Sequence, residues 1–235
     1  MDLNYKTAIV TGGTSGIGLA TAIKLKEKGA DVIITGRNEA RMKEYCNKYG
    51  FEGHIFDVSD EKAVLKFYND VTARHPRVDI LINNAAFGYF KKLTDTDTSR
   101  FIQLMNANVT GAMMMAREAA KIFIRQNYGD IINIASTAAV RGFENGTAYV
   151  ASKFALRGMT ECWRAELRKH NIRVMLINPS EVQTEFFVNS GSGTKDFNPT
   201  KLIADDIAHA IISALEMNDR GFVTELTVFA TNPNS

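Results

Sequence analysis

The sequence predicts an α/β fold in which a doubly wound, mainly parallel sheet of seven strands carries helices on both faces. Short runs rich in Val and Ile alternate with longer amphipathic segments along all 235 residues, as right-handed βαβ crossovers require. The runs are apolar at nearly every position, which is typical of strands covered on both faces. No linker, repeat or low-complexity tract interrupts the alternation, so a single domain over residues 1–235 is expected.

Each expected element is bounded where the hydrophobic periodicity changes. Strands are expected at residues 6–10, 31–35, 52–56, 79–83, 130–135, 173–178 and 222–229. Helices are expected at residues 17–28, 38–48, 60–74, 97–126, 146–170 and 204–217. Residues 189–200 are rich in Gly, Ser and Asn and are expected to form a mobile lid over the substrate. Ligands of such sheets bind beyond the carboxyl ends of the strands, so the functional residues are sought there.

Composition and charge are those of an ordinary globular protein. A formal net charge of +2 is too small to favour nucleic acid or an anionic membrane as a partner. No apolar run approaches the ~20 residues that span a bilayer, and the charged N-terminal segment is unlike a secretory leader. Cys46 and Cys162 have no metal-type spacing. We therefore expect reduced thiols, no metal and a cytoplasmic location.

A glycine-rich loop follows the first expected strand and leads into the first expected helix. In TGGTSGIG, residues Gly12, Gly16 and Gly18 permit a tight turn and a close approach of the backbone to a pyrophosphate. The helix N-terminus that follows favours negative charge. A tight turn alone would use the same residues. At this position in an alternating α/β chain, however, the loop favours a Rossmann-type dinucleotide site.

The end of the second expected strand indicates which dinucleotide binds. An acidic residue there would bind the ribose 2′-hydroxyl of NAD, but the sequence has Gly36 and Arg37. A guanidinium offers fixed, paired donors to a 2′-phosphate. The alternative is that Arg37 is an ordinary exposed charge. With the acid missing as well, NADP(H) is the favoured cofactor.

The candidate catalytic residues are Tyr149, Lys153 and Ser136. Tyr149 and Lys153 are four residues apart near the start of an expected helix, which places them on one face. A free phenol has a pKa of about 10, and a neighbouring ammonium lowers it. Such a tyrosine can protonate a carbonyl oxygen as hydride arrives, or deprotonate an alcohol in reverse. Ser136 ends the fifth expected strand and can donate to the same oxygen. The alternatives are a chance surface pair and a serine that bonds its own turn.

Several motifs in one order carry a family resemblance. They are TGGTSGIG, Asp57-Val58, NNAA at residues 83–86, Asn108, Ser136, YVASK and Asn178-Pro179. With these motifs the chain resembles the single-domain short-chain dehydrogenases/reductases over essentially its whole length. It departs from the common pattern at Ala86 and Ser180, which replace the usual glycines. Its C-terminus also lacks the Asp-Gly-Gly ending of many relatives.

The resemblance implies a role for each matched residue. Tyr149 would be the general acid/base, Lys153 would lower its pKa and hold the nicotinamide ribose, and Ser136 would orient the substrate carbonyl. Asn108 would hold water in a proton relay to Lys153, although a buried asparagine can equally satisfy backbone groups. The cofactor would contact Gly12, Thr14, Ser15, Gly16, Ile17, Gly18, Arg37, Asp57, Val58, Asn83, Asn84, Ala85, Tyr149, Lys153, Pro179, Val182 and Thr184.

The resemblance also implies an NADPH-dependent carbonyl reductase or alcohol dehydrogenase acting on a small molecule. Within this class, a 3-oxoacyl-[acyl-carrier-protein] reductase is the favoured activity. The alternatives are a reductase of a small ketone, sugar or steroid, and an NADP-sensing protein with a retired active site. A homotetramer or homodimer is implied, in which Met113, Met114, Met115 and Phe123 face either a subunit interface or the sheet. Aromatic residues of the variable loops favour an apolar or ring-bearing substrate: Phe87, Tyr89, Phe90, Phe143, Phe186 and Phe187.

Overall fold

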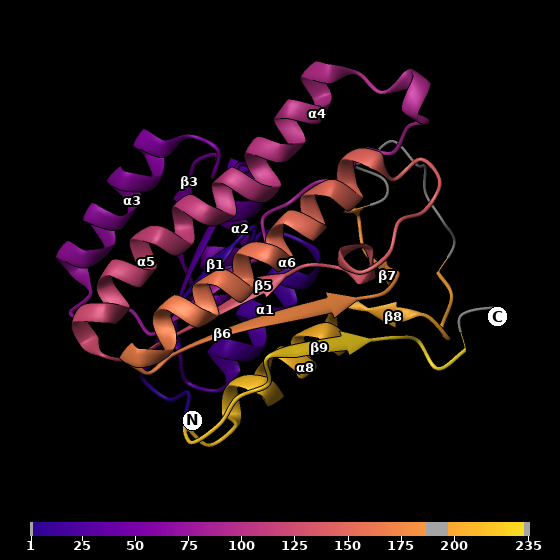
Figure 1. Ribbon diagram of the computed structural model, residues 1–235. Coiled ribbons are helices and arrows are strands. Elements are labelled where there is room, and N and C mark those ends of the chain that lie inside the picture. The colour runs from indigo at the N-terminus through magenta and orange to yellow at the C-terminus, as the bar shows by residue number, and fades with distance from the viewer. Residues whose placement is uncertain (1, 187–196, 233–235) are drawn as a thin grey trace.

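The computed structural model describes residues 2–186 and 197–232. Seven strands form the central sheet in the order β3-β2-β1-β4-β5-β6-β9 (Figure 1), and every neighbouring pair is parallel. The predicted doubly wound, seven-stranded sheet is confirmed. The strands are β1 (Thr7–Thr11), β2 (Asp31–Gly36), β3 (Glu52–Ile55), β4 (Ile80–Asn83), β5 (Gly129–Ile134), β6 (Ile172–Pro179) and β9 (Glu225–Val228).

Helices cover both faces of this sheet. One face packs against α1 (Gly16–Glu27), α2 (Glu39–Tyr49) and α8 (Ala204–Glu216), and the other against α3 (Glu61–Arg74), α5 (Ala112–Gln126) and α6 (Thr147–Leu167). Within β1, Ala8 and Val10 enter the first core cluster and Ile9 enters the second. This alternation explains why the strand is apolar at every position. Figure 1 shows α5 and α6 running side by side over the near face.

The helix expected at residues 97–126 is interrupted. It consists of α4 (Thr98–Met105), a π-helical segment at Asn106–Gly111, and α5. Gly111 is needed where this segment meets the chain after β3, because an added Cβ would lie 2.8 Å from Val58 Cγ2. A π segment leaves no hydrophobic period of its own in the sequence, and such segments are frequent at functional sites.

The methionine-rich part of α5 faces the sheet. Met114, Met115 and Phe123 are buried in the second core cluster, and Met113 packs against that cluster. The subunit-interface alternative is therefore wrong for the three buried side chains, because the same chain already covers them. The expected oligomeric state stays a prediction.

A small second sheet lies beyond the end of β6. It pairs β7 (Val182–Gln183) with β8 (Leu202–Ile203). Two-residue strands are too short to produce a recognisable alternation, which is why the sequence did not predict them. The amide of Gln183 donates to the carbonyl of Asn198 (2.7 Å) and holds this connection together. The lid expected at residues 189–200 lies outside the described residues except for 197–200.

Candidate active site

A cavity of about 1190 Å³ runs along the carboxyl edge of the sheet. Its walls come from the chain that follows β1, β2, β4, β5 and β6. It therefore spans the switch point between β1 and β4, where an open α/β sheet binds its ligand. A volume of this size suits an extended ligand such as a dinucleotide together with a small substrate.

The glycine-rich loop forms one wall of the cavity. Gly12 has a φ of +63°, and an added Cβ would lie 3.0 Å from the backbone of Ala85. Helix α1 starts at Gly16, has no acidic residue in its first turn, and its N-cap residue Ser15 makes no side-chain capping bond. Its first N–H groups are therefore suited to an anion such as a pyrophosphate. Thr14, Ser15, Gly16 and Ile17 all line the cavity, as expected.

Gly18 serves a different purpose from the other two glycines. It is absent from the cavity wall formed by the described residues. An added Cβ there would lie 2.4 Å from both the Gly12 carbonyl oxygen and the Asn84 amide nitrogen. Gly18 thus permits helix α1 to pack against its own entry turn, and the predicted direct contact with cofactor has no support in this geometry.

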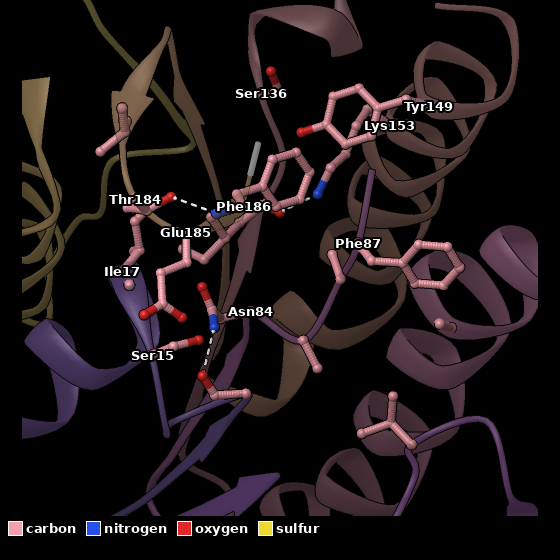
Figure 2. Close-up of a pocket in the computed structure, with 18 of the residues that line it drawn as sticks. Ser15, Ile17, Asn84, Phe87, Ser136, Tyr149, Lys153, Thr184, Glu185 and Phe186 are labelled. Carbon is pink, nitrogen blue, oxygen red and sulfur yellow. Dashed lines mark hydrogen bonds between the residues drawn. The ribbon is translucent and has the colours of Figure 1, made fainter. Parts of the chain in front are cut away.

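The two asparagines after β4 point in different directions. Asn84 lines the cavity, and its amide donates to the carbonyls of Thr11 (2.9 Å) and Gly12 (3.2 Å), which fixes the glycine turn (Figure 2). Asn83 is buried and donates instead to the carbonyl of Ala112 (3.1 Å) and the Asn133 side chain (3.0 Å). Including Asn83 among the cofactor contacts was wrong, because it is the last strand residue and faces the core.

Arg37 and Asp57 line the far end of the cavity. Arg37 donates to the Asp57 carboxylate (3.2 Å), and 68% of its side chain is exposed. Partial burial favours a higher pKa for Asp57, but hydrogen bonds from Ser59 and the charge of Arg37 outweigh it and hold the pKa below its usual value. Val58 completes this wall. This end of the cavity thus places an exposed guanidinium beside apolar and polar side chains, which suits an adenosine.

Arg41 is a further basic residue of this end, and sequence reasoning missed it. It lies in the first turn of α2, lines the cavity, and forms a two-pronged ion pair with Glu185 at 2.5 and 2.9 Å. Arg41 follows Arg37 by four residues, but α2 begins only at Glu39 and its N-cap residue Asn38 is extended. No helical spacing therefore links the two arginines, and the sequence carried no signal for Arg41.

Tyr149 and Ser136 lie at the opposite end of the cavity. In Figure 2 the phenol oxygen of Tyr149 lies between the Ser136 hydroxyl and the Lys153 amine. Burial raises the pKa of Tyr149 to about 12, and a hydrogen bond with Ser136 opposes this shift. Ser136 also accepts a bond from the backbone of Ala138 (3.1 Å), so it caps its own turn as well as facing the phenol.

Lys153 lies one turn after Tyr149 on α6 and is 3% exposed. Its amine donates to the carbonyl of Ile134 (2.9 Å) and lies 5.5 Å from the centre of the Tyr149 ring. Burial lowers the pKa of Lys153 to about 8. The expected lowering of the Tyr149 pKa by this ammonium is not what the structure shows. Burial dominates for both groups because it disfavours the charged form of each: it raises the pKa of Tyr149 and lowers the pKa of Lys153.

Asn108 lies behind the site, in the π-helical segment. Its side chain exchanges two hydrogen bonds with the backbone of Phe87, each 3.0 Å long, and donates to the Ser152 hydroxyl (3.2 Å). It is 2% exposed and absent from the cavity wall formed by the described residues. These contacts match the backbone-satisfying alternative, and they tie the loop after β4 to helix α6. The proton relay stays a prediction.

Aromatic rings surround the phenol of Tyr149. The ring of Phe90 is 5.3 Å from it, centre to centre, and that of Phe186 is 5.5 Å from it. Phe143 contacts Phe90 at 6.1 Å. Phe87 lines the cavity farther along, under Arg100, while Tyr89 uses its hydroxyl to accept from the backbone of Asp97. Phe187 lies outside the described residues. An apolar chamber therefore adjoins the phenol.

The segment after β6 forms the remaining wall. Pro179, Val182 and Thr184 line the cavity as expected. Ser180, which replaces a glycine of the family pattern, donates its N–H to the carbonyl of Val228 (2.9 Å) and joins the same wall. Over residues 2–186 and 197–232, no cluster of His, Cys, Asp and Glu suits a metal ion. The helices of that same part of the chain include none that is long and apolar enough to cross a membrane.

Many known proteins are similar to this chain, including the three that follow. An uncharacterized oxidoreductase of Staphylococcus saprophyticus is 32% identical, with 97% of this chain and 98% of the relative covered. The NADP-dependent 3-hydroxy acid dehydrogenase of Schizosaccharomyces pombe is 30% identical over 98% of this chain and 94% of the relative. A metagenomic short-chain oxidoreductase solved in complex with NADP superimposes with a TM-score of 0.86 and 31% identity, over 99% of this chain and 100% of the other.

The family assignment rests on the fold, on the site and on these similarities together. The motifs of the sequence converge on one cavity edge, where a glycine turn lies at one end and a Ser-Tyr-Lys group at the other. The family model described as short chain dehydrogenase matches residues 6–195. The protein belongs to the short-chain dehydrogenase/reductase family and is an oxidoreductase of that family.

Proposed function

We propose that the protein is an NADP(H)-dependent carbonyl reductase that also catalyses the reverse oxidation of the alcohol. One observation carries the proposal: a single cavity joins two arginines at one end to the Tyr149 phenol at the other. The arginines suit the 2′-phosphate of NADP. The glycine-rich turn and the free N–H groups at the start of α1 suit its pyrophosphate. The relative from S. pombe and the metagenomic structure, both named with NADP, support this choice.

The bound nicotinamide would supply or accept the hydride. The chain's own residues handle the proton and the oxygen. Because burial holds the pKa of Tyr149 at about 12, the phenol is protonated at neutral pH and is ready to donate to a carbonyl oxygen. The Ser136 hydroxyl donates a second hydrogen bond to the same oxygen as negative charge develops on it. Lys153 supplies a buried cation beside the phenol below its pKa of about 8.

The substrate that the chamber fits best is an apolar or ring-bearing ketone or aldehyde. Phe90, Phe143 and Phe186 surround the position where a carbonyl would meet Tyr149. Aromatic rings contribute burial and ring contacts to an apolar ligand and offer a sugar few hydrogen bonds. A 3-oxoacyl group would also fit this chamber through its acyl chain.

A second candidate is a 3-hydroxy acid and its oxo acid. The activity named for the S. pombe relative points to it. In this chain, Arg100 lines the cavity above Phe87 and would give a substrate carboxylate a cationic partner. The two candidates predict different effects of removing this charge. Arg100→Ala would weaken turnover of oxo acids and leave that of neutral ketones unchanged.

The direct test is a substrate panel with NADPH, followed by the loss of its absorbance. The panel contains aryl ketones, 3-oxoacyl thioesters, 3-oxo acids and open-chain sugars. Turnover of the aryl ketones or the thioesters, with little turnover of sugars, is expected. Tight NADPH binding with no turnover on the whole panel would instead indicate an NADP sensor.

Replacing Arg37 with alanine is expected to weaken NADPH binding about tenfold, because a charged donor to the 2′-phosphate is lost. The estimate is kept at the low end since the side chain is largely exposed. NADH affinity is expected to change less than about twofold, because NADH lacks that phosphate. Fluorescence titration of both cofactors measures the effect. An equal loss for the two cofactors would exclude the phosphate contact.

A further inference from the structure

Residues 184–186 line the cavity, and their three side chains approach three different parts of its wall. Thr184 approaches the glycine turn, since a Cβ built on Gly16 would lie 3.4 Å from the Thr184 side chain. Phe186 packs on Tyr149 and also approaches Gly88, where a built Cβ would lie 3.0 Å from its ring. Between them, Glu185 extends its side chain toward Ser15 and the start of α1 (Figure 2).

Glu185 joins this segment to the adenosine end of the cavity. Its two carboxylate oxygens accept from the two terminal nitrogens of Arg41, at 2.5 and 2.9 Å. Both side chains are partly exposed, 52% for Glu185 and 37% for Arg41. The hydrogen bond and charge of Arg41 lower the pKa of Glu185, and those of Glu185 raise the pKa of Arg41. The carboxylate is therefore ionised at neutral pH and accepts hydrogen bonds from both terminal nitrogens of Arg41.

A carboxylate and a phosphate both bind a guanidinium through a pair of its N–H donors. Glu185 occupies the Nη1 and Nη2 donors of Arg41, and this pair can donate in the two-pronged geometry to one anion at a time. Arg41 lies in the first turn of α2, four residues after Arg37 in sequence, and both arginines line the wall that we assign to the 2′-phosphate. A phosphate that binds through this same pair of donors competes with Glu185 for Arg41.

We propose that Glu185 is a specificity-determining residue that competes with the 2′-phosphate of NADP for Arg41. The inference rests on the proposed use of NADP(H). It adds an acidic residue, 144 positions away in sequence, that tunes the phosphate site. Exchange of Arg41 from Glu185 to the phosphate releases the central contact of residues 184–186.

The test is the binding of NADPH and NADH to Glu185→Gln, measured by fluorescence titration without substrate. Glutamine keeps the size of the side chain and removes its charge. NADPH is expected to bind about threefold more tightly, in line with the small free energies of exposed ion pairs. NADH, which has no phosphate for Arg41, is expected to change by less than about 1.5-fold. Glu181→Gln is the matched control, because Glu181 also lines the cavity and pairs with a cation, Lys201, at 3.4 Å.

Two further variants separate competition for Arg41 from a general effect of charge. In an Arg41→Ala background, Glu185→Gln should leave NADPH affinity unchanged, since the contested guanidinium is gone. Glu185→Asp keeps the charge but is one methylene shorter, so it should also tighten NADPH binding. Equal tightening for NADPH and NADH, or the same gain in Glu181→Gln, would overturn the proposal. So would weaker NADPH binding in Glu185→Gln, which would mean that the ion pair persists over the bound cofactor.

These outcomes differ from failure of the proposed function. If the unaltered protein binds neither NADPH nor its fragment 2′,5′-ADP, the assignment of the cofactor fails and the competition proposal fails with it. If it binds both while Glu185→Gln shows no selective gain, only the role of Glu185 is wrong.

Discussion

Tyr149→Phe is expected to lower kcat by about 10²–10⁴-fold, the usual contribution of a positioned general acid or base. Phenylalanine keeps the ring that packs between Phe90 and Phe186 but removes the proton that the phenol transfers. NADPH affinity is expected to stay within about twofold, because the glycine turn and the arginines are untouched. Stopped-flow measurement of hydride transfer, together with cofactor titration, measures both quantities on one preparation.

The control for this variant is Tyr5→Phe, which makes the same chemical change at a side chain that is 80% exposed and is not among the described residues that line the cavity. Its kcat should equal that of the unaltered protein. If Tyr149→Phe keeps more than about a tenth of the activity, another group delivers the proton. The Ser136 hydroxyl would then be the first to test, because it faces the phenol across the site.

The fold and the anion-binding turn could be predicted because their signals are local. Burial on both faces makes each strand apolar, and a glycine at positive φ marks the tight turn directly after β1. The same locality explains the placement of Tyr149 and Lys153, which depends only on the spacing within one helix. The position of Ser136 could be predicted because it lies at the end of the fifth expected strand, at the ligand-binding edge of the sheet. These groups meet at one edge because all neighbouring strands are parallel.

Features that depend on distant contacts could not be predicted. Arg41 and Glu185 are 144 residues apart, and neither side chain is unusual on a polar surface. Asn83 and Asn84 are chemically identical, and only the orientation of the last residue of β4 separates a core amide from a cavity amide. The π-helical segment has no sequence period, so the long helix appeared continuous.

The pKa values of Tyr149 and Lys153 also depend on contacts that are distant in sequence. From the sequence, Lys153 was expected to act on Tyr149 as a nearby charge. The fold buries both groups, and desolvation then dominates over their interaction. Burial depends on the packing of α6 against the rest of the chain, which spacing alone does not contain. The sequence therefore identified the residues of this pair, but the direction predicted for the Tyr149 pKa shift was wrong.

Lys153→Met is expected to abolish most activity and, at pH 7, to stabilise the protein. Burial lowers the pKa of Lys153 from 10.5 to about 8. The folded state therefore binds the proton less tightly than the unfolded state, and the cost of burying the ammonium is fully present below pH 8. The shift corresponds to roughly 3 kcal/mol. Methionine has a similar length without the charge, but it leaves the Ile134 carbonyl without its donor, at a cost of about 1 kcal/mol.

The net gain expected at pH 7 is about 2 kcal/mol in the free energy of unfolding, measured by urea denaturation without cofactor. As pH rises from 8 to 10.5, the folded state of the unaltered protein has lost this proton while the unfolded state still holds it, so its stability rises. The advantage of Lys153→Met should therefore vanish over that interval and reverse slightly above it, while the loss of kcat persists at every pH. A variant that is less stable at pH 7, or a gap that does not change with pH, would show that the ammonium is not buried at a cost. In that case the Lys153 ammonium would not lower the free energy of unfolding of the protein.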